Sequence, residues 1–407
     1  MGALTPVGNS LTEYWDNLVA GKSGAEPITH FDASKFKTQF ACEVKNFNAE
    51  DYFDRKEARK LDPYAQYALV TATEAWADSG LNEETINNDR AGVIWGSGIG
   101  GLKTFYDECT EFASGDGTPR FNPFFIPKMI ADIAAGHISM KWNLRGPNFT
   151  TVSACASSTN SLIDSFNYIR LGQADIIVSG GSEAAVTQAG VGGFNAMRAL
   201  SQRNDSPETA SRPFDLDRDG FVLGEGSGCL IVEELEHALA RGAKIYAEIG
   251  GGGMSADAHH ITAPHPEGLG AINVMRNVLR DAGMQPSEID YINVHGTSTP
   301  LGDVAESKAI REVFGEEAFN LNISSTKSMT GHLLGAAGAI EAIACVMAVQ
   351  DGIVPPTINH FTDDPEFNSQ LNFTFNKAQK RIVNAALSNT FGFGGHNASV
   401  IVKKFVQ

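Results

Sequence analysis

Short apolar segments alternate with longer segments of helical periodicity along most of the chain. Continuous apolar runs that predict buried strands lie at 92–95, 176–179, 229–232, 291–294 and 399–402. Apolar residues at helical spacing lie at 62–79, 157–170, 234–241, 269–282, 303–314 and 335–349. This alternation is typical of an α/β protein whose strands are mainly buried.

One local pattern occurs twice. At 150–170 a strand, a short turn with a reactive residue and a helix follow one another, and the same order is found at 291–314. Ligands in α/β sheets bind at such strand ends. We therefore expect two similar halves, 1–248 and 249–407, that bring their reactive groups to a shared crevice.

Composition and charge exclude several classes of protein. Of the 407 residues, 42% are hydrophobic and 19% are charged, as in an ordinary globular protein. The net charge of −17 argues against nucleic acid as a partner, because phosphate binding needs a basic surface. The apolar segment 333–349 contains Glu341 and predicts a buried helix, not a membrane span. Five scattered cysteines without a CxxC pair, and no signal peptide at the start, indicate a reducing, cytoplasmic setting.

Cys155 is the first candidate for chemistry. It lies in TVSACASST, with small residues on both sides and the predicted helix 157–170 directly after it. A thiol at a helix N-terminus lies near free N–H groups and the positive end of the helix dipole, which lowers its pKa. The same N–H groups can hold an oxyanion. The alternative is a buried structural cysteine, and this segment alone does not separate the two.

Two histidines and an ion pair form the second group of candidates. His295 ends an apolar strand and precedes the polar turn GTSTPLGD, so it either faces a cleft or is a structural histidine. Lys327 and His332 lie in STKSMTGHLLGAAG, which has little other charge. A buried lysine is costly unless it is paired, and Glu341 is the obvious partner. An internal ion pair without a catalytic part is the alternative here.

Glycine-rich segments form the third group. In SNTFGFGGHN, Gly392 and Gly394 flank Phe393, which suits a loop that gates a tunnel or donates a backbone N–H, or else a plain glycine turn in the core. The segments 96–101, 180–183 and 224–228 are interpreted as tight turns, because GSGIGG does not fit a dinucleotide fingerprint. Neither HExxH nor a tight His/Cys spacing occurs, which argues against a catalytic metal.

Together these segments resemble one family. TVSACASS, NVHGTSTPLGD, STKSMTGHLLGAAGAIE and NTFGFGGHN occur in the order and spacing of the β-ketoacyl synthases. So do GSGIGG, PFFIP, GVGGFNAMRALS and SRPFDLDRDGFVLGEG, so that the resemblance covers essentially the whole chain. It is greatest to the type II elongating synthases. It implies a thiolase-like α/β fold, with two pseudo-equivalent halves in a five-layer α-β-α-β-α arrangement, assembled as a homodimer.

The resemblance also implies a reaction and the residues that perform it. Cys155 matches the acylated nucleophile, His295 and His332 match the histidines of malonyl decarboxylation, and Lys327 with Glu341 matches the pair that organises the site. The reaction is a decarboxylative Claisen condensation that adds two carbons to an acyl chain. Substrates are carried on the phosphopantetheine of an acyl carrier protein, and neither a metal nor an organic cofactor is expected.

Further residues match the family's gate, tunnel and loops. Phe393, with Gly392 and Gly394 beside it, matches the gate, and its N–H should form the oxyanion hole with that of Cys155. The resemblance places Ile99, Phe194 and Phe125 at the acyl tunnel and Asp257 on a second mobile loop.

The implied carrier protein is acidic, so a chain of charge −17 needs a local basic surface to bind it. The expected docking residues are Lys56, Arg59, Lys60, Arg120, Arg198 and Arg203. Such a cluster is otherwise a solvated face.

Two departures from the family pattern stand out. Members open with an apolar strand before the segment seen here as GALTPVG, so we expect a sheet strand to be missing. The second departure is His396, which stands where threonine is more frequent. Three competing interpretations remain: a ketosynthase of polyketide or aryl-polyene assembly, a non-catalytic partner subunit, and a thiolase. The presence of Cys155 argues against the second, and the absence of a second cysteine from 391–397 argues against the third.

Overall fold

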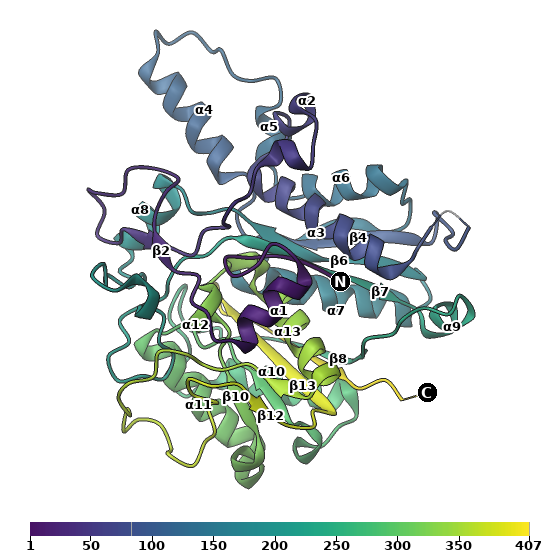
Figure 1. Cartoon of the computed structure of the whole chain (residues 1–407), viewed down its shortest axis with the longest axis vertical. Coiled ribbons are helices and arrows are strands. Elements are labelled where there is room, and N and C mark those ends of the chain that lie inside the picture. Colours follow the sequence, from purple (N-terminus) through teal and green to yellow (C-terminus); the bar gives the residue numbers. More distant parts are fainter. Residues whose placement is uncertain (83, 407) are drawn as a thin grey trace.

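A computed structural model of the chain describes residues 1–82 and 84–406 (Figure 1). It contains two five-stranded sheets. Spatial order in the first is β5 (Asn148–Thr151), β4 (Ala91–Gly96), β6 (Ile176–Glu183), β7 (Gly226–Glu233) and β1 (Gly2–Leu4). Spatial order in the second is β10 (Asn322–Ser324), β9 (Tyr291–Asn293), β13 (Ala385–Gly392), β14 (His396–Lys403) and β8 (Glu248–Ala256).

The two sheets repeat one topology. In each, the first three strands are parallel, and the fourth and fifth each run antiparallel to the strand before them. The first sheet takes its strands from residues before 234, and the second takes its strands from residue 248 onward. The expected pseudo-equivalent arrangement is therefore confirmed, whereas the division at residue 248 stays a prediction.

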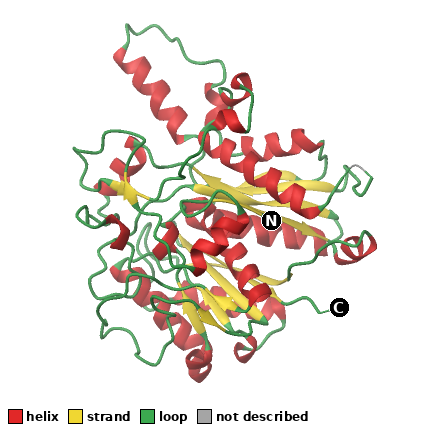
Figure 2. Ribbon diagram, viewed as in Figure 1, coloured by secondary structure: helices red, strands yellow, loops and turns green. Residues whose placement is uncertain are grey.

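Helices cover both sheets and separate them, as Figure 2 shows. The first sheet carries α3 (Pro63–Ser79) and α6 (Ile133–Trp142) on its outer face, and the second carries α10 (Leu269–Ala282), with α11 (Pro300–Phe314) packed against α10. Between the sheets lie α7 (Ser157–Arg170) and α13 (Ala337–Asp351). This is the expected five-layer α-β-α-β-α order.

Small residues let the two central helices approach closely. A Cβ at Gly338 would lie 2.0 Å from Thr159 Oγ1, and the Ala339 N–H donates to Ser158 Oγ at 2.9 Å. The segment Leu334–Asp351 is long and apolar enough to cross a membrane, yet 83% of it is buried inside the protein. It forms part of the core between the sheets.

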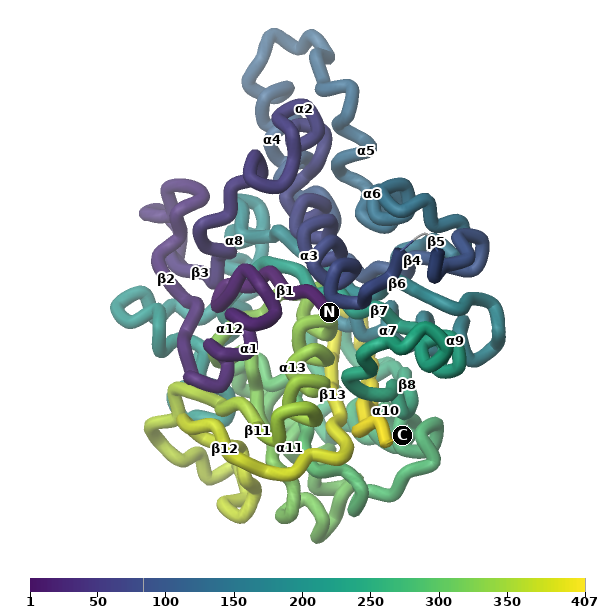
Figure 3. The backbone as a smooth tube through the Cα atoms, turned by 45° about the vertical axis from the view of Figure 1, so that its right-hand side comes forward, coloured from purple at the N-terminus to yellow at the C-terminus, as the bar shows by residue number. Residues whose placement is uncertain are grey.

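The other helices are α1 (Leu11–Val19), α2 (Arg55–Ala58), α4 (Leu102–Ser114), α5 (Phe125–Met129), α8 (Gln188–Ala196), α9 (Leu235–Ala240) and α12 (Lys327–Thr330). Two small sheets pair β2 (Glu26–Pro27) with β3 (Phe40–Ala41) and β11 (Ile353–Val354) with β12 (Gln379–Lys380). Helices α2, α4 and α5 project together from the body at one end (Figures 1 and 3).

Three local expectations are corrected. The counterpart of 150–170 is not 291–314, because α7 packs against α13 in the centre while α11 packs on α10 outside. The first strand is not missing: Gly2–Leu4 pairs with β7, although it is much shorter than its counterpart β8. The segments 180–183 and 226–228 are strand, not turn, because their glycines bring neighbouring backbones together. A Cβ at Gly180, for example, would lie 2.0 Å from Gly228 O.

Candidate active site

Cys155 lies at a sharp turn between a strand and a helix. It belongs to a short 3-10 turn, Ala154–Ala156, that follows β5 and runs directly into α7. Ala154 has a positive φ of 52°, which non-glycine residues rarely adopt. The Ser157 hydroxyl accepts from the Ser153 N–H at 3.0 Å and donates to Ala154 O at 2.6 Å, so it holds this turn. The thiol is therefore at the helix start, as the sequence predicted.

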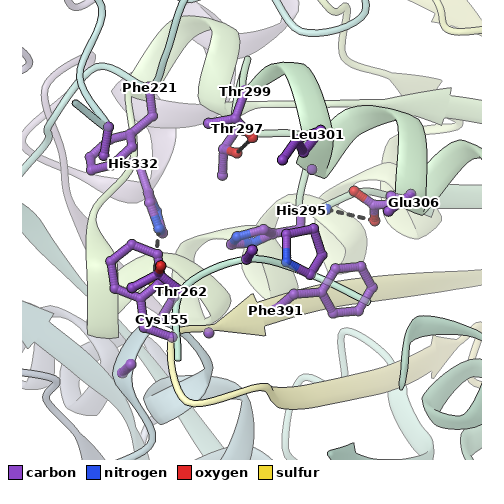
Figure 4. A pocket seen from close by; sticks show the side chains of 18 of the residues that line it. Cys155, Phe221, Thr262, His295, Thr297, Thr299, Leu301, Glu306, His332 and Phe391 are labelled. Atoms are coloured by element: carbon purple, nitrogen blue, oxygen red, sulfur yellow. Dashed lines mark hydrogen bonds between the residues drawn. The ribbon is translucent and has the colours of Figure 1, made fainter. Parts of the chain in front are cut away.

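The second half of the chain brings two histidines to this thiol. His332 Nε2 lies 3.1 Å from Cys155 Sγ, and both side chains are buried. The ring of His295 faces that of His332, with 5.2 Å between centroids and nearly perpendicular planes. Figure 4 shows both imidazoles directed to the space beside Cys155. The structure thus joins three residues that are up to 177 positions apart in the chain.

Buried groups fix the backbone of each histidine. Glu306, on α11, accepts from the N–H groups of His295 and Gly296 at 2.9 and 2.8 Å (Figure 4). The His332 N–H donates to Val222 O at 2.8 Å, and the Phe221 ring contacts the imidazole edge-on. These contacts fix the position of both histidines, and none of them uses a ring nitrogen of either imidazole.

Burial keeps the thiol and both imidazoles neutral. It raises the pKa of Cys155 to about 11, although the Lys327 charge and the Phe393 N–H act in the opposite direction. The expectation that the helix start lowers this pKa is therefore wrong for the free site: desolvation outweighs the helix terminus. Burial, together with the Lys327 charge, also holds the pKa of His332 well below its usual range. The same causes, with His332 in addition, lower the pKa of His295.

Lys327 and Glu341 form the predicted ion pair beneath the histidines. Their side chains are in direct hydrogen-bonded contact, and both are almost completely buried. Burial raises the pKa of Glu341 to about 7, and the Lys327 charge opposes that rise. Lys327 is therefore the cation that acts on both histidines and on the thiol.

The glycine loop after β13 lies directly on the thiol. A Cβ at Gly392 would lie 2.8 Å from Ser153 O, and Gly394 has a φ of +85°, so both positions favour glycine. The Phe393 N–H and that of Cys155 face the sulfur. The loop is tied to the segment after β8, since the Asp257 N–H donates to Gly395 O at 2.9 Å and the Gly394 N–H donates to Ile261 O at 2.7 Å. The two predicted loops therefore contact each other.

The site opens into a cavity of about 530 Å³. The predicted residues that line it are Ile99, Cys155, Phe194, Arg198, Asp257, His295, His332, Gly392 and Phe393. Lys327 and Glu341 lie behind this lining. Phe125 lies outside the cavity of the single chain, because it stacks on Phe105 and Phe121 in the projecting α4–α5 region.

The predicted basic residues divide into three places. Lys56, Arg59 and Lys60 are exposed on and just after α2. Arg120 is exposed on the α4–α5 connection and lies 3.2 Å from Asp116. Arg198 is exposed at the cavity, whereas Arg203 is half-buried and donates to Asp217 O at 2.9 Å.

Sequence inspection missed several residues around the site. Glu306, Thr297, Thr299 and Phe391 all line the cavity. Phe391 lies beside His295, with 5.7 Å between ring centroids (Figure 4). Within the described residues, no group of three or more His, Cys, Asp or Glu side chains could hold a metal ion.

Comparison with known proteins identifies the family. A model of the N-terminal domain of β-ketoacyl synthases matches residues 1–238, and a model of the C-terminal domain matches residues 246–361. This chain belongs to the β-ketoacyl synthase family. The synthase is 49% identical over 405 residues to 3-oxoacyl-[acyl-carrier-protein] synthase 2 of Synechocystis sp., covering 100% of this chain and 97% of the relative. The Coxiella burnetii protein of the same name is 48% identical over 404 residues, covering 99% and 97%.

Solved structures share the fold of this synthase. A β-ketoacyl synthase from Burkholderia phymatum superposes with a TM-score of 0.92 at 34% identity, covering 100% of this chain and 98% of that one. A type II polyketide ketosynthase, solved with its acyl-carrier protein and bound to a hexaketide, superposes with a TM-score of 0.91 at 32% identity, with the same coverage.

Proposed function

We propose that this synthase elongates fatty acyl chains on an acyl carrier protein by decarboxylative Claisen condensation with a malonyl group. The observation that carries the proposal is the meeting of a thiol and two neutral imidazoles in one cavity, with Cys155 Sγ 3.1 Å from His332 Nε2. The relatives named 3-oxoacyl-[acyl-carrier-protein] synthase 2, at 48–49% identity over nearly full length, support this reaction.

In the first half-reaction Cys155 takes the acyl group. The sulfur attacks the carrier thioester, and the carbonyl oxygen becomes negative beside the N–H groups of Cys155 and Phe393. The thiol proton is transferred to the departing phosphopantetheine sulfur as the thioester breaks, while His332 Nε2, 3.1 Å from Cys155 Sγ, holds the cysteine sulfur in place. The carrier leaves as a free thiol, and an acyl thioester remains on Cys155.

In the second half-reaction malonyl carrier enters the same cavity. Neutral His295 and His332 donate hydrogen bonds to its thioester oxygen, so that the enolate is stabilised as carbon dioxide leaves. The enolate carbon attacks the acyl group, the Cys155–acyl bond breaks, and the released thiolate takes up one proton from the solvent. The product is a β-ketoacyl carrier two carbons longer. The low pKa of both histidines suits this role, since an imidazolium would be costly to bury.

The test is a single-turnover assay with pre-acylated enzyme. We expect His295→Ala and His332→Ala to lower the rate of carbon dioxide release by about 10²–10³, the usual effect of removing one oxyanion donor. His237→Ala is the matched control, because that histidine contacts Glu233 near α9 and does not line the cavity. Decarboxylation at the wild-type rate in His295→Ala would overturn the proposal.

The carrier is proposed to dock on the basic residues between α2 and the cavity. Lys56, Lys60 and Arg198 are exposed, and Lys60 Nζ lies 5.4 Å from the centre of the Phe124 ring, whereas Arg203 is half-buried and donates to Asp217 O. Charge reversal at Lys60 and Arg198 should raise the KM for the carrier and weaken its salt dependence. Lys377→Glu, near β12 at the other end of the molecule, is the control (Figure 1). Unchanged carrier binding by the double reversal would count against this surface.

A homodimer is proposed on the edge of the first sheet. Strand β5 ends that sheet, and Val152 directly after it is 61% exposed. An open edge with an apolar neighbour favours pairing with another strand, and a second copy supplies one by two-fold symmetry.

We place the reaction in a reducing, cytoplasmic setting, because Cys155 must stay a free thiol.

Polyketide assembly is the second candidate, favoured by the structural match to a ketosynthase bound to a hexaketide. The higher identity to the elongating synthases favours fatty acid elongation. Repeated condensation without reduction of the β-keto group, measured with purified carrier, would instead support the polyketide assignment.

A further inference from the structure

Glu183 is a buried carboxylate for which the proposed reaction has no use. It ends β6 and has no exposed surface. Its Oε2 accepts from the N–H groups of Gly98 at 2.8 Å and Gly335 at 3.0 Å. Its Oε1 accepts from the Ile99 N–H at 3.1 Å and from the Ser97 hydroxyl at 3.3 Å. One side chain therefore binds two backbone segments that are more than 230 residues apart in sequence.

Both segments reach the cavity. Gly98 and Ile99 line it from the loop after β4, and Ile99 is 40% exposed. Leu334, next to Gly335, lines it from the loop that begins at His332. Leu334 has a positive φ of 49°, an unfavourable backbone conformation for leucine that neighbouring contacts must maintain.

Gly98, Gly335 and Glu183 are packed so closely that no larger residue fits at either glycine. A Cβ at Gly335 would lie 2.3 Å from Gly98 N and 2.7 Å from Glu183 Oε2, and a Cβ at Gly98 would lie 2.9 Å from the same oxygen. The His332 loop is held from its other side by Val222 O and by the Gly224 N–H. Glu183 is thus the second anchor of the loop that carries His332.

We propose that Glu183 is a positioning residue that joins the acyl-chain contact at Ile99 to the His332 loop, so that the fit of the acyl chain and the His332–Cys155 contact are set together. The proposal rests on the proposed function. An acyl chain that displaces Ile99 shifts the Glu183 carboxylate through its hydrogen bond to the Ile99 N–H, and the carboxylate in turn shifts Gly335, whose N–H it also binds. Chains that fit leave His332 in place, and chains that do not fit misplace it.

A glutamine is the sharpest probe of this role. It keeps the shape of the side chain but replaces one acceptor oxygen with an NH₂ group, which faces N–H donors that it cannot bind. An aspartate keeps the charge but is too short to reach both segments. The pKa of Glu183, raised by burial to about 7 against the four hydrogen bonds, agrees with a carboxylate enclosed by protein.

The experiment compares acylation of Cys155 by octanoyl and palmitoyl carriers, followed by decarboxylation of malonyl carrier. We expect Glu183→Gln to change the palmitoyl-to-octanoyl ratio of kcat/KM by about tenfold, the effect of one lost hydrogen bond to a charged group, and to slow decarboxylation. Ser97→Ala, which removes one bond to Oε1, should shift the ratio in the same direction by less.

Asp215→Asn is the matched control. Asp215 is also fully buried and accepts from three N–H groups, those of Asp217, Phe361 and Thr362, but it does not line the cavity. It should lower the melting temperature and leave the ratio unchanged. If Glu183→Gln and Ser97→Ala also leave the ratio at its wild-type value, Glu183 is merely structural. Failure of the wild type to acylate at all would instead refute the proposed function.

Discussion

Replacing Lys327 by methionine tests the buried ion pair. Lys327 and Glu341 are each at most 2% exposed, and among the described residues Glu341 Oε2 has no hydrogen-bond partner. Methionine has a similar length and no charge, so the substitution leaves a buried carboxylate alone. Removing one partner of such a pair costs about 3–5 kcal/mol of stability, because the remaining charge is uncompensated.

The cost should depend on pH in a defined direction. The folded-state pKa of Glu341 is already raised to about 7 with Lys327 present, and it must rise further without that charge. An acid whose pKa is higher in the folded than in the unfolded state destabilises the fold increasingly as pH rises from the unfolded toward the folded pKa. The loss in Lys327→Met is therefore larger at about pH 8.5 than at about pH 6.

Thermal unfolding at both pH values, with Lys327→Met/Glu341→Met as the matched variant, measures this effect. At the higher pH, the melting temperature of the single variant should be roughly 5–15 °C below that of the wild type. The double variant should recover most of the loss, because two apolar side chains of similar volume need no partner. A single variant as stable as the wild type, or a loss independent of pH, would refute the reasoning.

Two further predictions concern stability and packing. His30→Gln should lower the melting temperature more at about pH 6 than at about pH 9. The hydrogen bond to Glu225 raises the pKa of His30, so the stabilisation by the charged imidazole is complete below the ordinary histidine pKa and is lost as pH rises through the raised pKa. An equal loss of melting temperature at both pH values would contradict this. Gly335→Ala should abolish condensation, measured as carbon dioxide release, because its Cβ would overlap Gly98 N, whereas Gly193→Ala on α8 meets nothing within 4 Å and should stay active. Full activity of Gly335→Ala would contradict the close approach.

The central layers of the fold could be predicted because their residues carry a strong local signal. Strand β4, the first half of β6 and the start of β9 are apolar runs, and α3 is marked by Asp62 at its N-cap and Gly80 at its C-terminus. Strand β8 was missed because it contains four consecutive glycines, which weaken any strand signal. Their purpose is visible only in three dimensions: a Cβ at Gly253 would lie 2.6 Å from Val278 N on α10.

The candidate site could be named from motifs, but its electrostatics could not. The flanking small residues and the helix after Cys155 predicted a lowered thiol pKa, and only the folded structure shows the burial that raises it. Glu183 lay in a glycine-containing segment that was interpreted as a turn. The two backbone segments that it binds come from distant parts of the sequence, so nothing in the sequence singled it out. A side chain that binds backbone groups far away in the sequence, unlike a helix cap, leaves no local pattern of residue types by which sequence inspection finds it.

Intact mass of the protein after mixing with acyl carrier protein tests the central claim most directly. The account predicts a gain of one acyl group on the wild type, its absence in Cys155→Ala, and its loss from the wild type when malonyl carrier is added. A folded wild-type protein that gains no acyl group, or a Cys155→Ala variant that gains one, would contradict the assignment of Cys155 as the nucleophile.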